Sequence, residues 1–374
     1  MPSEHARLSA SASHRWMNCP PSALLGEGIK DETSEFAQEG TEAHALCEYK
    51  LKKALGMEAK DPTEGLAHYT QEMEDCATDY VSFVLEKLEQ VKQKCPDPVV
   101  LIEQKLDFSA FVPDGFGTGD CVIMADGTLE VIDFKYGRGV LVDADNNSQM
   151  MLYALGACEV FGPLYVIGDI GMTIFQPRLG NISSSHISGE ALYLWANKVL
   201  EPAAQKAITG DGELAAGDWC RFCKVKAQCR ERARMNMELA QYEFREPPLL
   251  DEAEVAQILT KLDGLVAWAD DVKGYALGEA LKGKRIAGFK LVEGRSIRKY
   301  SDEAKVAEKV ESAGYDPYER KVKGITAMTG LLGKTRFNEL LGALVIKPQG
   351  KPALVPESDK RPEMTNNEFN ETEE

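Results

Sequence analysis

The sequence from residue 117 to residue 139 reads GTGDCVIMADGTLEVIDFKYGRG, and the rest of the chain is best understood from it. Residues 118–124 and 129–135 are rich in Val and Ile, which favour strands. The Asp126-Gly127 pair between them is typical of the tight turn that joins paired strands. The stretch therefore predicts two neighbouring antiparallel strands.

Two acids and a lysine lie on these strands. Because side chains alternate between the faces of a strand, Asp133 and Lys135 share one face. Ile132 and Phe134 point the other way, into apolar packing. Asp120 on the neighbouring strand can reach the same place as Asp133. The sequence predicts two carboxylates and one ammonium group at the edge of a small sheet.

This set of groups suits metal-assisted hydrolysis of phosphodiesters. Hard cations such as Mg²⁺ or Mn²⁺ prefer oxygen ligands, which Asp120, Asp133 and the main-chain carbonyl of Phe134 could supply. Lys135 could orient the attacking water or stabilise charge on the phosphorane. An Asp-x-Lys alone is weak evidence, because charged residues at strand ends are commonly just solvated.

Two helical patterns accompany the strands. Gln149 and Tyr153 are four residues apart in QMMLYALG and lie on one helix face. Upstream, the sequence GTEAHALCE places His44 and Glu48 on one face in the same way.

In this order, the motifs G-T-x-x-H-x-x-x-E, G-D, D-x-K and Q-x-x-x-Y resemble the RecB-type branch of the PD-(D/E)XK nuclease superfamily, over residues 40–153. The resemblance implies an α/β fold with an αβββαβ core, with which the predicted order of helices and strands agrees. It also implies roles for six residues: metal ligands at His44, Asp120 and Asp133, the catalytic lysine at Lys135, and groups that position DNA or the lysine at Gln149 and Tyr153.

Four of the nine cysteines form a second pattern. Cys220, Cys223 and Cys229 lie close together in DWCRFCKVKAQCRER, and Cys19 stands far away in WMNCPPS. The arrangement resembles the iron-sulfur subset of RecB-like nucleases, including AddB and CRISPR-adaptation nucleases, in which one cysteine before the nuclease motifs and three after them hold a [4Fe-4S] cluster. Four thiolates fit tetrahedral zinc equally well by ligand count, so only the resemblance favours iron-sulfur.

Binding Cys19 together with the later trio would close a loop around the whole nuclease core. Cluster binding would then be part of the folding free energy, so we expect a structural staple rather than a redox centre. The other five cysteines have no partner spacing and are expected to be unliganded thiols: Cys47, Cys76, Cys95, Cys121 and Cys158.

The flanking segments complete the predicted domain over residues 1–245. Apolar spacing predicts a helix over 64–94, a strand over 98–108, one or two strands over 164–177 and a helix over 188–208, with a polar connection before the last. Glu103, on the strand over 98–108, is expected either to support the metal site or to be an edge carboxylate, and Glu48 is a second supporting candidate.

Glu246-Pro247-Pro248 marks a boundary, because adjacent prolines resist both helix and central strand. A helical domain is predicted over 249–350, beginning with a helix over 250–281 whose apolar residues are spaced for burial. Residues 282–300 predict a basic hairpin that either contacts DNA or is a solvated edge. Its candidate DNA-binding residues are Lys284, Arg285, Arg295 and Arg298. Residues 357–374 predict a disordered acidic tail.

Composition narrows the function classes. The chain has 374 residues and a formal charge of −17, which argues against a protein that coats nucleic acid through its global field. No apolar run approaches membrane-spanning length and the N-terminus lacks the apolar segment of a signal peptide, so we expect an intracellular protein.

These observations predict a metal-dependent DNA nuclease, specifically an exonuclease that processes linear ends in replication or recombination. The layout also resembles a RecB-like family encoded by bacteriophages and prophages. That resemblance implies the bacterial cytoplasm, and a phage single-strand-binding or annealing protein as a further partner. The alternatives are a non-catalytic DNA-binding or scaffold subunit of a recombination complex, and a zinc-stapled interaction protein.

Overall fold

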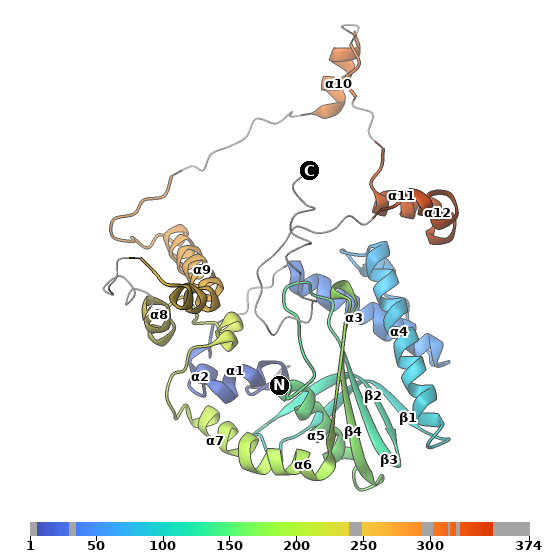
Figure 1. Ribbon diagram of the computed structural model, residues 1–374, viewed down its shortest axis with the longest axis vertical. Coiled ribbons are helices and arrows are strands. Elements are labelled where there is room, and N and C mark those ends of the chain that lie inside the picture. Colours follow the sequence, from blue (N-terminus) through green and yellow to red (C-terminus); the bar gives the residue numbers. More distant parts are fainter. Residues whose placement is uncertain are drawn as a thin grey trace. The chain divides into compact units, whose positions relative to one another are not determined.

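The computed structural model is organised around a five-stranded mixed sheet (Figure 1). It describes residues 6–29, 35–238, 249–292, 302–312, 315–318 and 322–346. The strands, which lie in sequence order across the sheet, are β1 (Val99–Asp107), β2 (Phe116–Ala125), β3 (Gly127–Phe134), β4 (Ile167–Gln176) and β5 (Asn181–Ser188). All neighbours are antiparallel except β3 and β4, which are parallel and joined through helix α5 (Ser148–Phe161).

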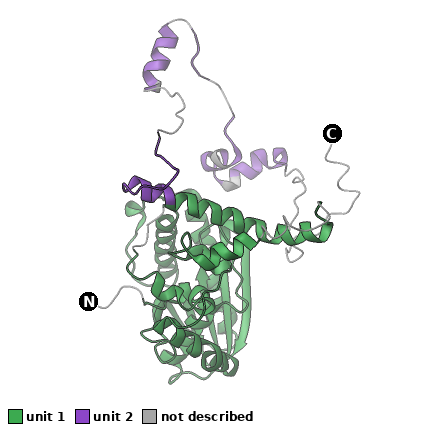
Figure 2. Cartoon of the chain, turned by 90° about the vertical axis from the view of Figure 1, so that its left-hand side faces the viewer, with its two compact units in different colours: residues 1–275 green, residues 276–374 purple. Residues whose placement is uncertain are grey.

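The described chain divides into two compact units, Met1–Tyr275 and Ala276–Glu374 (Figure 2). The division falls inside helix α9 (Glu252–Leu281), later than the predicted boundary after residue 245. Two ion pairs explain why most of α9 belongs to the first unit. Asp271 of α9 lies 2.8 Å from Lys226 Nζ and 2.6 Å from Nη1 of Arg232, a buried residue of helix α8 (Arg230–Met237).

The two faces of the sheet carry separate hydrophobic cores. One core joins the sheet to α5, α6 (Gly189–Trp195) and α7 (Glu201–Thr209) and includes Trp16 of helix α1 (Ser13–Asn18). The other joins the sheet to α3 (Glu35–Ala54) and α4 (Gln71–Lys92). The short helix α2 (Ser22–Leu25) follows α1. The sheet is therefore a middle layer with helices on both sides.

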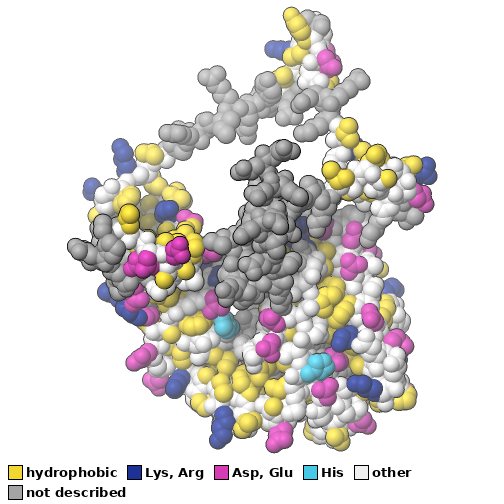
Figure 3. Space-filling view, viewed as in Figure 1, with side chains coloured by type: hydrophobic (Ala, Val, Ile, Leu, Met, Phe, Trp, Pro, Cys, Tyr) yellow, Lys and Arg dark blue, Asp and Glu magenta, His cyan; other side chains and the backbone are white. Residues whose placement is uncertain are grey.

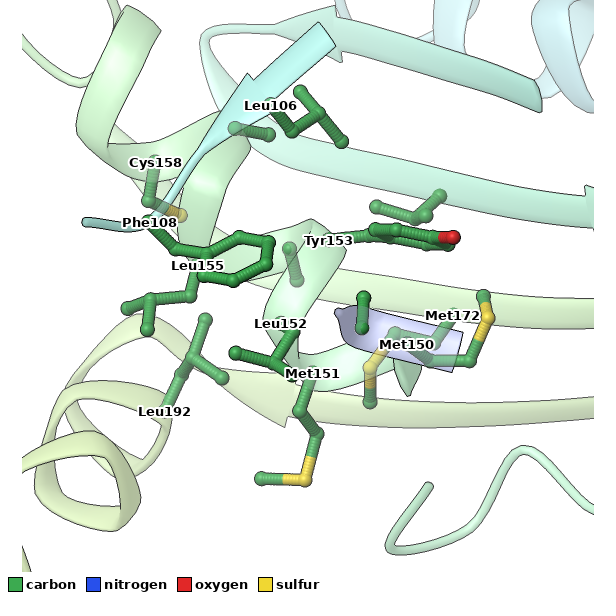
Figure 4. Close-up of a cluster of buried hydrophobic side chains, with 14 of the residues drawn as sticks. Leu106, Phe108, Met150, Met151, Leu152, Tyr153, Leu155, Cys158, Met172 and Leu192 are labelled. Atoms are coloured by element: carbon green, nitrogen blue, oxygen red, sulfur yellow. The ribbon is translucent and has the colours of Figure 1, made fainter. Parts of the chain in front are cut away.

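Helix α5 is the best buried helix of the first core. Every residue from Met150 to Cys158 is buried, because α5 crosses the sheet and packs against Leu106 of β1 and Leu192 of α6 (Figure 4). The Asn147 side chain caps its first turn by accepting hydrogen bonds from the main-chain N–H groups of Gln149 and Met150. This fixes the turn of α5 that carries Gln149.

Two sequence predictions in this unit are wrong in detail. Helix α4 begins at Gln71 rather than at residue 64, because the Thr70 side chain caps it and residues Thr63–Gly65 form a separate 3-10 turn. Residues 181–188 form strand β5 rather than a polar connection. Their serines gave no apolar alternation, but pairing with buried β4 supplies the main-chain bonds, and the Thr173 and Ser184 hydroxyls lie 2.9 Å apart.

The C-terminal region also departs from prediction. All of α9 is described and none of its side chains is buried, although its apolar residues were expected to be. Residues 282–292 contain no strand, since Gly283 and Gly288 adopt positive φ values of +90° and +80° that interrupt an extended chain. The rest of the predicted hairpin, with Arg295 and Arg298, lies outside the described residues, as does the tail over 357–374.

Beyond this point the predicted helices are present as three short ones. They are α10 (Glu303–Ser312), α11 (Ile325–Leu332) and α12 (Lys334–Leu341). Two of the four candidate DNA-binding residues of the predicted hairpin, Lys284 and Arg285, are described. Lys284 Nζ lies 3.2 Å from Glu279 Oε2, and Arg285 is exposed.

Opposite charges share the surface. On the face seen in Figure 3, the described Lys and Arg side chains are scattered among Asp and Glu rather than gathered in one area. None of the helices in the described part of the chain is both long and apolar enough to span a membrane.

Arg178 ties the elements around the second core together. Its guanidinium lies 3.2 Å from Glu39 of α3 and 3.3 Å from Glu72 of α4, and it sits 4.4 Å from the ring centroid of Tyr136, which follows β3. The side chain is 11% exposed, so these contacts are largely shielded from solvent.

We expect Arg178→Ala to lower the free energy of unfolding of the protein by about 2 kcal/mol, because several charged hydrogen bonds are lost together. Urea denaturation followed by circular dichroism measures the change. Arg234→Ala is the matched control, since Arg234 pairs only within α8 and is 63% exposed, and it should have little effect. Equal effects of both changes would contradict this role of Arg178.

Candidate active site

The site forms where β2 and β3 diverge. Their pairing ends at Cys121 opposite Ile132. Beyond that pair, the main-chain N–H of Phe134 donates a hydrogen bond to Asp120 Oδ2 at 2.7 Å, so a carboxylate stands in for a strand carbonyl. The other carboxylate oxygen, Oδ1, lies 3.3 Å from His44 Nδ1. Asp120 thus links the end of β3 to helix α3.

Glu103 faces Asp120 across a kink in β1 and β2. Leu101 packs in the first core and Ile102 in the second, but Leu106 returns to the first core, so the alternation of β1 shifts by one residue. The shift occurs at Glu103, whose φ is +50°, a conformation that costs a non-glycine residue about 1–3 kcal/mol. Both carboxylates therefore turn toward the α3 side, where Glu103 and Asp120 line one pocket with His44.

Helix α3 holds the imidazole in place. Its buried residues Ala43, Leu46 and Cys47 pack in the second core, and His44 points between them toward the sheet with 33% of its side chain exposed. The imidazole meets the Phe134 ring edge-on, with centroids 5.4 Å apart. Among the described residues, one group of three potential metal-ligand atoms lies within 4.8 Å of one another, and it comprises His44, Glu103 and Asp120.

Asp133 of β3 and Lys135, which directly follows β3, form a second group of contacts with helix α5. Lys135 Nζ lies 2.7 Å from Asp133 Oδ2 and donates a hydrogen bond to Oδ1 at 3.0 Å. From α5, Gln149 Nε2 lies 3.5 Å from the same Oδ1 and donates to the Tyr153 hydroxyl at 3.0 Å. Gly117 makes room for the Tyr153 ring, since a Cβ there would lie 2.7 Å from it. The sheet end thus brings groups from both layers together.

Opposite charges set the protonation of the metal-free site. Burial disfavours the imidazolium of His44, but the nearby charge of Asp120 outweighs it and raises the pKa of His44 to about 9. Burial opposes the charge on Lys135 too, but Asp133 raises its pKa above the usual value. Burial raises the pKa of Asp133 above its usual value, although the nearby charge of Lys135 opposes the rise. Burial and the negative charge of Asp120 together raise the pKa of Glu103 to about 7.

Two buried oxygens lack hydrogen bonds at this place. The Tyr80 hydroxyl, in the pocket with His44 and Asp120, has no partner. Asp133 Oδ2 has a close ion pair with Lys135, but no hydrogen bond of normal geometry reaches it. Buried oxygens without donors suit a cation or its bound water, so the residues present fit a divalent metal ion.

The structure places six of the predicted site residues at this end of the sheet in two contact groups, His44 with Asp120, and Asp133 with Lys135, Gln149 and Tyr153. Asp133, a predicted metal ligand, is not in the group of described ligand atoms that lie within 4.8 Å of one another. Glu103 joins the same group more closely than sequence reasoning suggested, and its strand kink left no sequence signal. Glu48 lines the pocket, with its carboxylate 2.5 Å from Lys52 Nζ. The Phe134 carbonyl remains a predicted ligand, and the Phe134 N–H donates the hydrogen bond to Asp120.

The four predicted cluster cysteines meet in a second pocket. Cys19, at the end of α1, lines it together with Cys220, Cys223 and Cys229 from the turns before α8. By ligand count the four thiols suit either a four-iron cluster or tetrahedral zinc.

The remaining five cysteines lie away from this pocket. Four of them are buried, in the core of the sheet or its helices, and Cys95 is half-buried. Arg221, between Cys220 and Cys223 in sequence, donates a hydrogen bond to the main-chain oxygen of Gly139 in the loop after β3 at 3.2 Å.

A family model described as a protein of unknown function, DUF2800, matches residues 5–362. The chain belongs to this family. Among solved structures, the crystal structure of SSO0001 is similar to half of this chain and to 95% of its own chain, at 14% sequence identity. The TM-score is 0.23, too low to support an argument about fold or function.

We expect His44→Gln to lower the stability of the metal-free protein most below pH 6.5 and least above about pH 9. The raised pKa means that the imidazolium stabilises the fold fully below the ordinary pKa, and that this contribution is lost as the pH rises through the folded value. Urea unfolding in the presence of a chelator measures it. His186→Gln, at the exposed pair with Asp169, is the control. A loss of stability that is independent of pH would contradict the prediction.

Proposed function

We propose that the protein is a metal-dependent deoxyribonuclease of the RecB-like type that degrades DNA from linear ends. The observation that carries the proposal is the meeting of His44, Asp120, Asp133 and Lys135 at one end of the sheet. These residues come from three elements and both layers, and a scaffold protein has no chemical need to assemble them.

The strand order supports a PD-(D/E)XK core. Helices α3 and α4 precede three antiparallel strands, α5 crosses one face, and β4 returns parallel to β3. This is the αβββαβ order that the sequence resemblance implies, with β5 added at the edge beyond β4.

His44 and Asp120 would hold a Mg²⁺ or Mn²⁺ ion, with Asp133 and the Phe134 carbonyl as further ligands. When bound, the ion polarises the phosphoryl group and lowers the pKa of a coordinated water. Asp120 is 12% exposed, and the Phe134 N–H fixes its Oδ2, so its Oδ1, beside His44, is oriented before any ligand arrives.

Lys135 carries the positive charge that the reaction needs beside the phosphate. Its ammonium group is held by Asp133, a 3% exposed carboxylate, and is itself 28% exposed, so it is fixed but reachable. A preoriented ammonium stabilises negative charge that develops on the phosphorane oxygens. Gln149 reaches Asp133 from α5, and the Tyr153 hydroxyl accepts a hydrogen bond from Gln149.

Cys19, Cys220, Cys223 and Cys229 would hold a [4Fe-4S] cluster. The role of the four thiolates is structural, because they join the chain before the nuclease motifs to the chain after them. Arg221, between two of them, also contacts the loop that follows Lys135. Loss of the cluster would therefore loosen the catalytic end of the sheet.

Lys135→Ala is expected to reduce DNA hydrolysis in Mg²⁺ or Mn²⁺ by about a hundredfold or more, since charge stabilisation of this kind has that magnitude. Release of label from linear, circular and single-stranded DNA measures the activity, and circular DNA should resist the unmodified protein. The matched control is Lys87→Ala, because Lys87 also faces a buried carboxylate, Glu130, at 4.0 Å, but on α4.

Hydrolysis at an unchanged rate by Lys135→Ala would reject the assignment. DNA binding by the unmodified protein without hydrolysis in either metal would instead favour the non-catalytic scaffold.

Cys19→Ala is expected to remove the visible absorption of anaerobically purified protein and to lower its thermal stability, because one of four cluster thiolates is lost. Cys158→Ala, at a buried thiol in the sheet core, should keep the colour. Stoichiometric zinc and no iron in the purified protein would overturn the iron-sulfur assignment.

A further inference from the structure

Glu103 is the carboxylate of the site that no other side chain uses. In the part of the chain that the structure describes, its side chain has no hydrogen bond and no ion pair. The other nearby acids are engaged: Asp133 by Lys135, Asp120 by the Phe134 N–H, and Glu48 by Lys52. Glu103 is half-buried, and it lines the pocket that also contains His44 and Asp120.

The backbone directs this carboxylate at the site. Pairing of β1 with β2 is interrupted only where Glu103 lies opposite Asp120, between the pairs Ile102 with Cys121 and Gln104 with Gly119. The register is the same on both sides of the interruption, so no residue is inserted. The φ of +50° at Glu103 instead changes the direction of the chain locally, and Glu103 comes to line the pocket that contains Asp120 and His44 of α3.

We propose that Glu103 is a further metal ligand, which binds the ion together with His44 and Asp120. The three ligand atoms lie within 4.8 Å of one another, close enough to bind one ion after small side-chain adjustments. The buried Tyr80 hydroxyl, which has no partner, faces the same pocket and can bond to water on the ion. The inference rests on the site of the proposed nuclease and adds a ligand from β1 to it.

A ligand role also explains a residue choice that packing does not. Glycine adopts this backbone conformation without strain, whereas the described Glu103 side chain has no hydrogen bond or ion pair that offsets the strain. A bound cation would supply the missing partner of this carboxylate.

The test is Mn²⁺ binding, measured without DNA by electron paramagnetic resonance on protein first stripped with a chelator. Glu103→Gln keeps the shape but removes the charge, and should weaken Mn²⁺ binding about tenfold or more. Glu103→Gly should weaken binding as much while leaving the urea midpoint unchanged or higher, because the strain is relieved. Asp169→Asn, at the carboxylate paired with His186 on the same sheet, is the control and should bind Mn²⁺ normally.

Normal Mn²⁺ binding by Glu103→Gln or Glu103→Gly would overturn the proposal, as would an unmodified protein that binds no Mn²⁺. A large drop of the urea midpoint in Glu103→Gly would assign the side chain a structural role and also overturn it. The nuclease assay judges the proposed function separately. Both Glu103 variants could bind Mn²⁺ more weakly while the unmodified protein does not hydrolyse DNA. That result would support Glu103 as a metal ligand and reject only the proposed nuclease activity.

Discussion

The candidate site depends on one hydrogen bond, from the main-chain N–H of Phe134 to Asp120. Because a side-chain oxygen satisfies this donor, β2 and β3 can part after the Cys121–Ile132 pair without leaving a buried N–H unbonded. The gap at the strand ends is where His44 reaches the sheet. A continued ladder would close it and bury Asp120 as an ordinary strand residue.

The divergence also explains why two separate cores serve one site. Ile132 and Phe134 belong to the core of α3 and α4, while Leu129 and Val131 belong to that of α5. Side chains from one layer cannot normally touch those from the other, because the sheet lies between them. At the strand ends the two groups influence one another through charge, since Asp133 and Lys135 both act on the pKa of His44. His44 comes from α3, and Gln149, which reaches the partner of Lys135, comes from α5.

The cysteine pocket places a second constraint on the same end of the molecule. Cys19 follows α1, which packs in the α5 core through Trp16, and the later three cysteines precede α8. Arg221 joins this pocket to the loop after Lys135, and the ion pairs of Asp271 attach α9 to it. The chain before and after the sheet is thus fastened at one place, which suits thiolates that share a single cofactor.

The sequence by itself determined the local structure: the paired strands around Asp126-Gly127, the helices that carry His44 and Gln149, and the two sets of residues that were expected to gather. Period-two and helical spacings are local properties, and they were sufficient for these. Tertiary structure alone decided strand β5, the exposure of α9 and the place of Glu103. Ser184 is held in a strand by its neighbour β4, and Glu103 is turned by a left-handed backbone opposite Asp120. The residues next to Ser184 and Glu103 in the sequence predict neither the partner strand nor that φ angle, because both depend on contacts with residues that are distant in sequence.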